Sequence, residues 1–263
     1  SSRIVHDTHN YGVLSFTDVI VKSSNVGAIK IGFKLGTERL SQYVARYGFG
    51  RQVSRDFPGE SSGIVWNPQK WTDSALASVS MGYQVAVTPL QMVAGVSALV
   101  NGGEMHPPTL LAHAEGEPVA GTRVVKRQTS EQLRQMMRLV VSEGTGDTAD
   151  VPGYQVAGKT GSAEKSGGGG YRRKALLSSF IACFPGNDPR YVVLVMIDEP
   201  KGTKATYGLI QAHWNAAPAV GHIIAQIGPL LGLTPSPVNY DEPKKPAMAV
   251  NAVAKGSNLA EVE

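Results

Sequence analysis

Lys159 and Thr160 end a segment, GYQVAGKT from Gly153, that matches the pattern G-x-x-x-x-G-K-[ST]. In nucleotide hydrolases this pattern forms a loop whose backbone N–H groups and lysine hold phosphates. Such a loop needs a buried strand before it and a helix N-terminus after it. The flanking residues therefore decide whether the segment is a nucleotide site.

Neither flank of GYQVAGKT supports a phosphate-binding loop. The preceding SEGTGDTADVP is small, acidic or proline where a strand should be apolar. The following SAEKSGGGG is rich in glycine, and each glycine disfavours a helix interior by about 1 kcal/mol relative to alanine. Tyr154, Val156 and Ala157 alternate with polar or small residues, which is typical of a strand. We therefore interpret the segment as a strand that carries Lys159.

Two short polar motifs remain as candidates for chemistry, SSN at 23–25 and KTGS at 159–162. Each has a structural explanation when taken alone, because serine and asparagine between helices form caps and turns. A lysine on a strand is usually an exposed charge. In this order, however, they match two of the three signatures of the serine penicillin-recognising enzymes, which combine S-x-x-K, S-x-N and K-T-G.

Over most of residues 1–230 the chain resembles the transpeptidase domain of class B penicillin-binding proteins, specifically the cell-division type that builds septal peptidoglycan. The resemblance extends to KSSNVGAIKIG, RYGFG, FPGE, MGYQVAVTPLQM and VVSEGTGDTADVPGYQVAGKTGSAEK. It implies the α+β fold of penicillin-binding proteins and β-lactamases, with an antiparallel sheet flanked by helices. It also implies a serine-type D,D-transpeptidase that uses no cofactor and no metal.

In this family a serine attacks the D-Ala-D-Ala carbonyl of a peptidoglycan stem peptide, and an amine from a neighbouring peptide resolves the acyl-enzyme. The resemblance implies that β-lactams acylate the same serine. It implies division-complex membrane proteins as partners, including a glycosyltransferase, and no nucleic acid. The implied location is the periplasmic face of the bacterial inner membrane, with an N-terminal anchoring helix that is not present in this chain.

The resemblance assigns catalytic roles to Ser23, Asn25 and Lys159. Ser23 is expected to relay protons between the nucleophile and the leaving amine, and Asn25 to bind a substrate amide and the catalytic lysine. A lysine has an ordinary pKa near 10.4, and burial or a neighbouring positive charge lowers this pKa enough for base catalysis. Lys159 is expected to be the second lysine of the site, disfavouring protonation of the first and attracting the substrate carboxylate.

Substrate-binding roles fall to Ser24, Thr160, Gly161 and Ser162. The hydroxyls of Thr160 and Ser162 are expected to bind the terminal carboxylate of the stem peptide. Gly161 leaves space for an extended peptide to pair with the strand. The N–H of Ser162 is expected to supply half of an oxyanion hole.

The S-x-x-K signature occurs once, as SAEK at Ser162 and Lys165. This signature works when the serine begins a helix and the lysine follows one turn later, whereas SAEK continues the expected strand. In the family the nucleophile precedes S-x-N by several tens of residues, and here only 22 residues precede Ser23. We therefore expect the C-terminal part of the domain, incomplete at its N-terminus and inactive alone.

Two alternatives stay open at this point. A D,D-carboxypeptidase or a β-lactamase would resolve the acyl-enzyme with water, and the motifs do not separate these enzymes from a transpeptidase. A related domain without its serine could instead be a non-catalytic module that binds peptidoglycan or division proteins.

The elements that position the motifs follow from capping and turn signals. Helices are predicted to begin at Ser15, after residue 25, at Thr37, at Thr88 and at Ser130. Strands are predicted at 153–163, 176–184 and 190–198 as an antiparallel meander, with a final helix that includes Ile223, Ile224 and Ile227 covering one face. The transpeptidase part is placed at 1–234, and a linker or disordered tail at 235–263.

Composition argues against other classes of protein, such as nucleic-acid-binding and metal-binding proteins. A length of 263 residues with 42% hydrophobic residues allows a substantial core. The basic residues behind the net charge of +4 are dispersed, which disfavours a nucleic-acid groove. Cys183 lies in the apolar run LLSSFIACF and is expected in the core. His6 and His9 lack further ligands at metal-site spacing beyond Asp7.

Overall fold

The computed structural model describes residues 3–54, 56–114, 116–167, 170–236 and 259–262. The chain divides into two compact units, each of which has its own contacts. Unit 1 comprises residues 1–20, 24–131 and 247–263, and unit 2 comprises residues 21–23 and 132–246. Helices and antiparallel strands are both present, so the predicted α+β class is confirmed.

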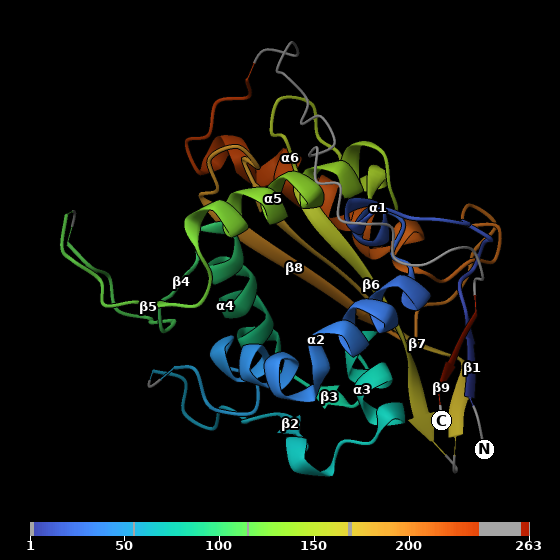
Figure 1. Cartoon of the computed structure of the whole chain (residues 1–263). Helices are drawn as coiled ribbons and strands as arrows, with labels where there is room; N and C mark the ends of the chain where they lie inside the picture. The colour runs from blue at the N-terminus through green and yellow to red at the C-terminus, as the bar shows by residue number, and fades with distance from the viewer. Residues whose placement is uncertain (1–2, 55, 115, 168–169, 237–258, 263) are drawn as a thin grey trace. The chain divides into compact units, whose positions relative to one another are not determined.

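Unit 2 contains a three-stranded antiparallel sheet in the order β6-β7-β8. Its strands are β6 (Ala157–Gly167), β7 (Gly170–Phe184) and β8 (Tyr191–Asp198), which run side by side in Figure 1. The predicted meander is therefore confirmed, although β6 begins at Ala157 and not at Gly153. The residues before it form a turn in which the N–H of Tyr154 donates to Val151 O.

Helices cover the unit 2 sheet and complete its core. They are α5 (Arg127–Ser142), whose first residues belong to unit 1, the short η2 (Asp147–Ala149) and η3 (Ala212–Trp214), and α6 (Ala216–Leu230). The predicted final helix is thus confirmed, with Ile224 fully buried. The core joins side chains from helices and sheet, including Val141, Val156, Phe180, Phe184, Val220 and Ile224.

Cys183 occupies the core position that its sequence context predicts. Its side chain is fully buried on β7, and burial raises the pKa of its thiol to about 12. A thiol in this state is a small apolar group with little reactivity.

Unit 1 is mainly helical. Its helices are α1 (Phe16–Val21), whose last residue belongs to unit 2, α2 (Asn25–Arg46), η1 (Pro68–Lys70), α3 (Asp73–Ser80) and α4 (Pro89–Val100). Three short antiparallel pairs accompany them: β1 (Arg3–His6) with β9 (Leu259–Val262), β2 (Ile64–Val65) with β3 (Val85–Ala86), and β4 (Glu104–Met105) with β5 (Thr122–Arg123).

The predicted capping residues mark the starts of two helices of unit 1, α1 and α4. The N–H of Asp18 donates to Ser15 Oγ at 3.1 Å, and Thr88 forms a reciprocal capping box with Gln91. The two helices predicted on either side of Gly36 are joined as α2, with a kink where Gly36 has φ 76°. A glycine adopts a positive φ readily, so the first helical stretch ends at Gly36 and the second begins after it, as the sequence predicted.

Two sequence predictions differ from the structure at their boundaries. The helix predicted from Ser130 begins at Arg127, because the Ser130 hydroxyl does not cap it and donates to Leu99 O at 2.6 Å. The predicted linker or disordered tail lies largely outside the described residues, at 237–258. Its described end differs from the prediction, since residues 259–262 form β9 and pair in register with β1.

Helices α2 and α3 approach each other closely at Gly32. A Cβ added at Gly32 would lie 1.8 Å from Ser80 Oγ and 2.7 Å from Ser80 Cβ. We expect Gly32→Ala to lower the free energy of unfolding by about 1–3 kcal/mol, measured by urea denaturation, because overpacking pushes the helices apart.

Gly95→Ala in α4 is the matched control for this prediction. Its new methyl group would meet the Phe49 ring at 3.4 Å, an ordinary contact, while alanine favours the helix by about 1 kcal/mol over glycine. Its unfolding midpoint should therefore stay constant or rise. Equal midpoints for the two variants would contradict the close approach at Gly32.

Candidate active site

Lys159 and Ser23 meet within unit 2, although 136 residues separate them in sequence. Nζ of Lys159, on β6, donates to Ser23 Oγ at 2.7 Å. Ser23 follows α1 in the turn before α2 and has a positive φ of 56°. This conformation is uncommon for a residue with a Cβ, and it occurs where the surrounding structure holds the chain in place.

The amine of Lys159 is surrounded by neutral oxygens. Besides Ser23, Nζ donates to Thr160 O at 3.1 Å and to Thr160 Oγ1 at 3.4 Å. Neither a carboxylate nor a histidine is among the hydrogen-bond or ion-pair partners described for this amine. Burial lowers the pKa of Lys159 from 10.5 to about 8, because the ammonium loses water without gaining a counter-ion. Lys159 therefore gives up a proton far more readily than an exposed lysine.

The lowered pKa of Lys159 can be measured directly. In ¹³C NMR of protein with lysines labelled at Cε, we expect one resonance to titrate near pH 8, while exposed lysines titrate at about pH 10.4. Between these pH values the unfolded chain binds more protons at this residue. The unfavourable contribution of Lys159 to stability should therefore fade as the pH rises through that window.

Lys159→Met is the control for the titration, and it should remove both the resonance and this part of the pH dependence. A resonance that disappears in Lys159→Met but titrates near 10.5 in the parent protein would show that the amine is not buried in solution.

The other residues of the KTGS motif lie along β6. Thr160 Oγ1 is 2.9 Å from Oγ1 of Thr145, a residue to which the sequence analysis gave no role. The one sequence feature that includes Thr145 is the stretch SEGTG, which belongs to the wider resemblance to the family. Ser162 Oγ accepts from the N–H of Ala212 at 3.1 Å. A Cβ added at Gly161 would lie 2.6 Å from Ser179 Oγ, so glycine allows a close approach of β6 and β7.

The remaining motif residues, Ser24 and Asn25, begin α2 in unit 1. Ser24 is 4% exposed; its Oγ accepts from Gly27 N at 2.9 Å and donates to Asp7 Oδ2 at 2.6 Å. The N–H of Asn25 donates to Asp7 Oδ1 at 2.6 Å. The Asp7 carboxylate therefore caps the helix, which is favourable beside the positive end of the helix dipole. Substrate contacts of Ser24 and of the Asn25 side chain stay predictions.

The SAEK match has the geometry of a strand. Ser162 and Lys165 both belong to β6, so they are not one helical turn apart. Lys165 Nζ donates to Asp198 Oδ1 at 2.9 Å and to Glu199 Oε1 at 3.2 Å, and these hydrogen bonds raise the pKa of Lys165. Lys165 thus stays protonated and cannot act as the base for Ser162. Residues 157–160, the end of the segment GYQVAGKT, also lie in this strand, so the segment does not form the phosphate-binding loop whose pattern it matches.

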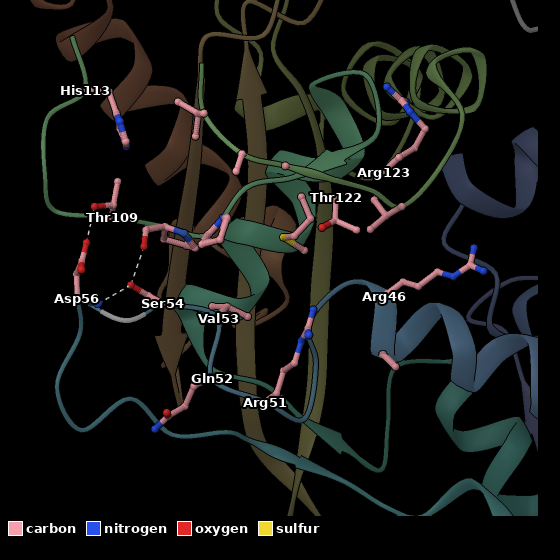
Figure 2. A pocket seen from close by; sticks show the side chains of 18 residues that line it. Arg46, Arg51, Gln52, Val53, Ser54, Asp56, Thr109, His113, Thr122 and Arg123 are labelled. Atoms are coloured by element: carbon pink, nitrogen blue, oxygen red, sulfur yellow. Dashed lines mark hydrogen bonds between the residues drawn. The ribbon is translucent and has the colours of Figure 1, made fainter. Parts of the chain in front are cut away.

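A separate concave region lies entirely within unit 1, with a volume of about 1260 Å³ (Figure 2). Arg46 and Arg51 contribute positive charge to its lining, whereas Arg123 forms an ion pair with Glu104; Met105 is among its apolar side chains. Asp56 and Thr109 point toward each other in Figure 2, and this hydrogen bond, with a second from Leu110 N, lowers the pKa of Asp56. This charge balance suits an anionic ligand.

An antiparallel sheet whose strand carries a half-buried lysine, hydrogen-bonded to a serine beside a helix, is typical of the penicillin-recognising class of serine acyl-transfer enzymes. Residues 3–217 match the penicillin binding protein transpeptidase domain, and the chain belongs to this family. The resemblance inferred from the motifs is thereby confirmed.

Two relatives illustrate the sequence similarity. Stage V sporulation protein D of Bacillus subtilis is 37% identical over 235 residues, and the probable peptidoglycan D,D-transpeptidase FtsI of Caulobacter vibrioides is 37% identical over 241 residues. The alignments cover 86% and 88% of this chain but 36% and 41% of those proteins. The chain therefore spans less than half the length of these relatives.

Solved structures show the same fold. Penicillin binding protein 3 of Mycobacterium tuberculosis, complexed with ampicillin, has a TM-score of 0.80 at 31% identity, covering 91% of this chain and 56% of that one. The transpeptidase domain of Burkholderia pseudomallei penicillin-binding protein 3 has a TM-score of 0.78 at 30% identity, covering 91% of this chain and 74% of that one.

Within the described ranges, each helix falls short of the length or apolarity that a membrane crossing requires.

Proposed function

We propose that the protein is a septal peptidoglycan D,D-transpeptidase that cross-links stem peptides through a serine acyl-enzyme. The observation that carries this proposal is the 2.7 Å contact between Lys159 Nζ and Ser23 Oγ, made by a lysine whose pKa is lowered. The attacking serine belongs, in this proposal, to an S-x-x-K segment outside these 263 residues, so the chain alone is inactive.

The contacts of Lys159 support a proton-transfer role. When the serine attacks the D-Ala-D-Ala carbonyl, its hydroxyl proton must leave as the C–O bond forms, and the departing D-Ala amine must gain a proton. Ser23 can carry a proton because its hydroxyl both donates and accepts. Lys159 holds Ser23 in position and contributes positive charge near the substrate carboxylate, which Thr160 and Ser162 bind. Asn25 orients the substrate amide.

The septal role and its setting extend the same proposal. One relative is a probable D,D-transpeptidase named FtsI, and a solved relative was determined with ampicillin. By analogy, we infer that β-lactams acylate this protein, and that it works with division-complex membrane proteins, including a glycosyltransferase. The inferred location is the periplasmic face of the inner membrane, with an N-terminal anchoring helix.

Intact-mass measurement after exposure to penicillin tests the proposed function. A version extended upstream through an S-x-x-K segment should gain the mass of one penicillin, whereas the 263-residue chain should gain none. A folded extended version that stays unlabelled would overturn the enzyme assignment. An adduct on Ser162 of the shorter chain would overturn the exclusion of SAEK.

The D,D-carboxypeptidase alternative differs in the acceptor that resolves the acyl-enzyme. With a stem-peptide substrate and a competing amine, a transpeptidase forms the cross-linked amide, while a carboxypeptidase forms the free acid. Mass spectrometry of the two products therefore separates these two activities.

A second candidate function is a non-catalytic module that binds an acidic segment of a division protein. The arginine-lined concavity of unit 1 favours this function, since opposite charge supports binding and orientation. Fluorescence anisotropy with a labelled acidic peptide should show binding that is lost in the double variant Arg46→Glu, Arg51→Glu. Lys126→Glu is the control, since Lys126 lies outside the lining, although this variant changes the charge by less than the double variant. An equal loss of peptide binding in Lys126→Glu would indicate a general charge effect and contradict a defined site.

A further inference from the structure

A further side chain, Thr145, extends the hydrogen-bond chain of the proposed active site beyond Lys159 and Thr160. Lys159 Nζ lies 3.4 Å from Thr160 Oγ1, and Thr160 Oγ1 lies 2.9 Å from Thr145 Oγ1. Thr145 is separated from both catalytic motifs in sequence. Its hydroxyl therefore reaches the lysine through one intermediate side chain, without contacting the lysine itself.

The loop that carries Thr145 is fixed against the segments that carry Ser23 and Thr160. A Cβ added at Gly144 would lie 2.6 Å from Val21 O, two residues before Ser23. A Cβ added at Gly146 would lie 2.8 Å from the ring of Phe180, the residue that pairs with Thr160 across the sheet. These close approaches leave Thr145 little freedom to move away from the site.

The groups involved fix the direction of the hydrogen bond from Lys159, and the proposal assigns the direction of the hydrogen bond between Thr160 and Thr145. A lysine ammonium has three donors and no acceptor, so Thr160 Oγ1 must accept from it. The Thr160 hydroxyl proton then points elsewhere, and Thr145 Oγ1 is the acceptor within reach at 2.9 Å. When Thr160 instead donates to a substrate carboxylate, the Thr145 hydroxyl can reverse and donate to Thr160.

We propose that Thr145 is a positioning residue whose hydroxyl orients the Thr160 hydroxyl, so that Thr160 offers a lone pair to Lys159 before substrate binds. The importance of this role for turnover rests on the proposed transpeptidase function. The hydrogen-bond geometry itself belongs to this chain and can be measured without turnover.

The test compares Thr145→Val with Thr145→Ser and Thr148→Val. Valine keeps the shape of threonine but removes the hydroxyl, and serine restores the hydroxyl. Thr148 lies three residues further along the chain, in η2, and its hydroxyl donates to His213 O at 2.7 Å, so it matches the substitution without reaching Lys159. The measurement is the Lys159 titration by ¹³C NMR in the whole chain, with circular dichroism to establish folding.

In Thr145→Val the pKa of Lys159 should fall by roughly half a unit, because the Thr160 hydroxyl is free to donate to the neutral amine. Thr145→Ser should return the pKa to the parent value, and Thr148→Val should leave it unchanged. If Thr145→Val does not fold, Thr145→Ala replaces it, and the difference from Thr145→Ser remains the test.

Three results would overturn the proposal: no shift in a folded variant without the hydroxyl, the same shift in Thr145→Ser, or the same shift in Thr148→Val. Penicillin labelling of the upstream-extended version is a separate measurement. Failed labelling with the predicted titration would reject the enzyme function and keep the hydrogen-bond assignment.

Discussion

Lys159→Ala should slow penicillin acylation of the upstream-extended protein by at least about 100-fold, the scale on which positioned proton-transfer groups act. The side chain is irreplaceable at this place because Nζ contacts Ser23 Oγ and both oxygens of Thr160. Alanine removes all three contacts and the positive charge that we propose lies near the substrate carboxylate. The rate constant can be followed with a fluorescent penicillin and gel densitometry.

Lys165→Ala is the matched control, since it removes a second lysine from the same strand. Lys165 pairs with Asp198 and Glu199, and exposed ion pairs contribute little to stability. Its acylation rate should stay within a factor of a few of the parent value. Unchanged acylation in folded Lys159→Ala would refute the assignment of Lys159, and equal losses in both variants would indicate damage to the sheet.

Phe180→Ala should have the largest effect on stability, lowering the free energy of unfolding by about 3–5 kcal/mol. The ring is fully buried in the core of unit 2, and it fills the space beside Gly158 and Gly146. Removing it leaves a cavity beneath β6 and the Thr145 loop together. Urea denaturation of both proteins measures the difference.

Ile181→Val, at the next position of β7, is the control for this cavity. Ile181 lies on the other face of the strand and loses one methylene, so the expected cost is about 1 kcal/mol. If Phe180→Ala costs no more than Ile181→Val, the ring is not the central packing element of unit 2.

The sequence predicted elements that depend on nearby residues. The Ser15 and Thr88 caps, the kink glycine Gly36 and the meander all follow from signals within a few positions. The start of α5 was misplaced because Ser130 binds Leu99 O, a residue 31 positions away. Local capping rules do not include such a distant partner.

The candidate site depends on contacts that no local pattern contains. The pairing of Ser23 with Lys159 was anticipated only through the family resemblance, because neither motif specifies the other by spacing. Thr145 and the helix-capping Asp7 were missed, since a threonine in a glycine-rich turn and an aspartate near two histidines have many ordinary roles.

Arg138 illustrates the same limit within the core of unit 2. Its side chain is 6% exposed, a burial that charge alone argues against. It is accommodated because Nη1 donates to Asp150 Oδ1 at 2.8 Å and to Val156 O at 2.9 Å. Both acceptors lie beyond the end of α5, so helical periodicity could not reveal them.

Cys183 makes the opening of the unit 2 sheet observable with ordinary chemistry. A disulfide reagent reacts with the thiolate, and this buried thiol, the single cysteine of the chain, becomes reactive when β7 separates from its neighbours. The modification rate therefore reports the population of opened molecules. Under the proposed function, acylation of the upstream-extended protein by a β-lactam should slow that rate, which would report ligand binding without a radioactive or fluorescent drug.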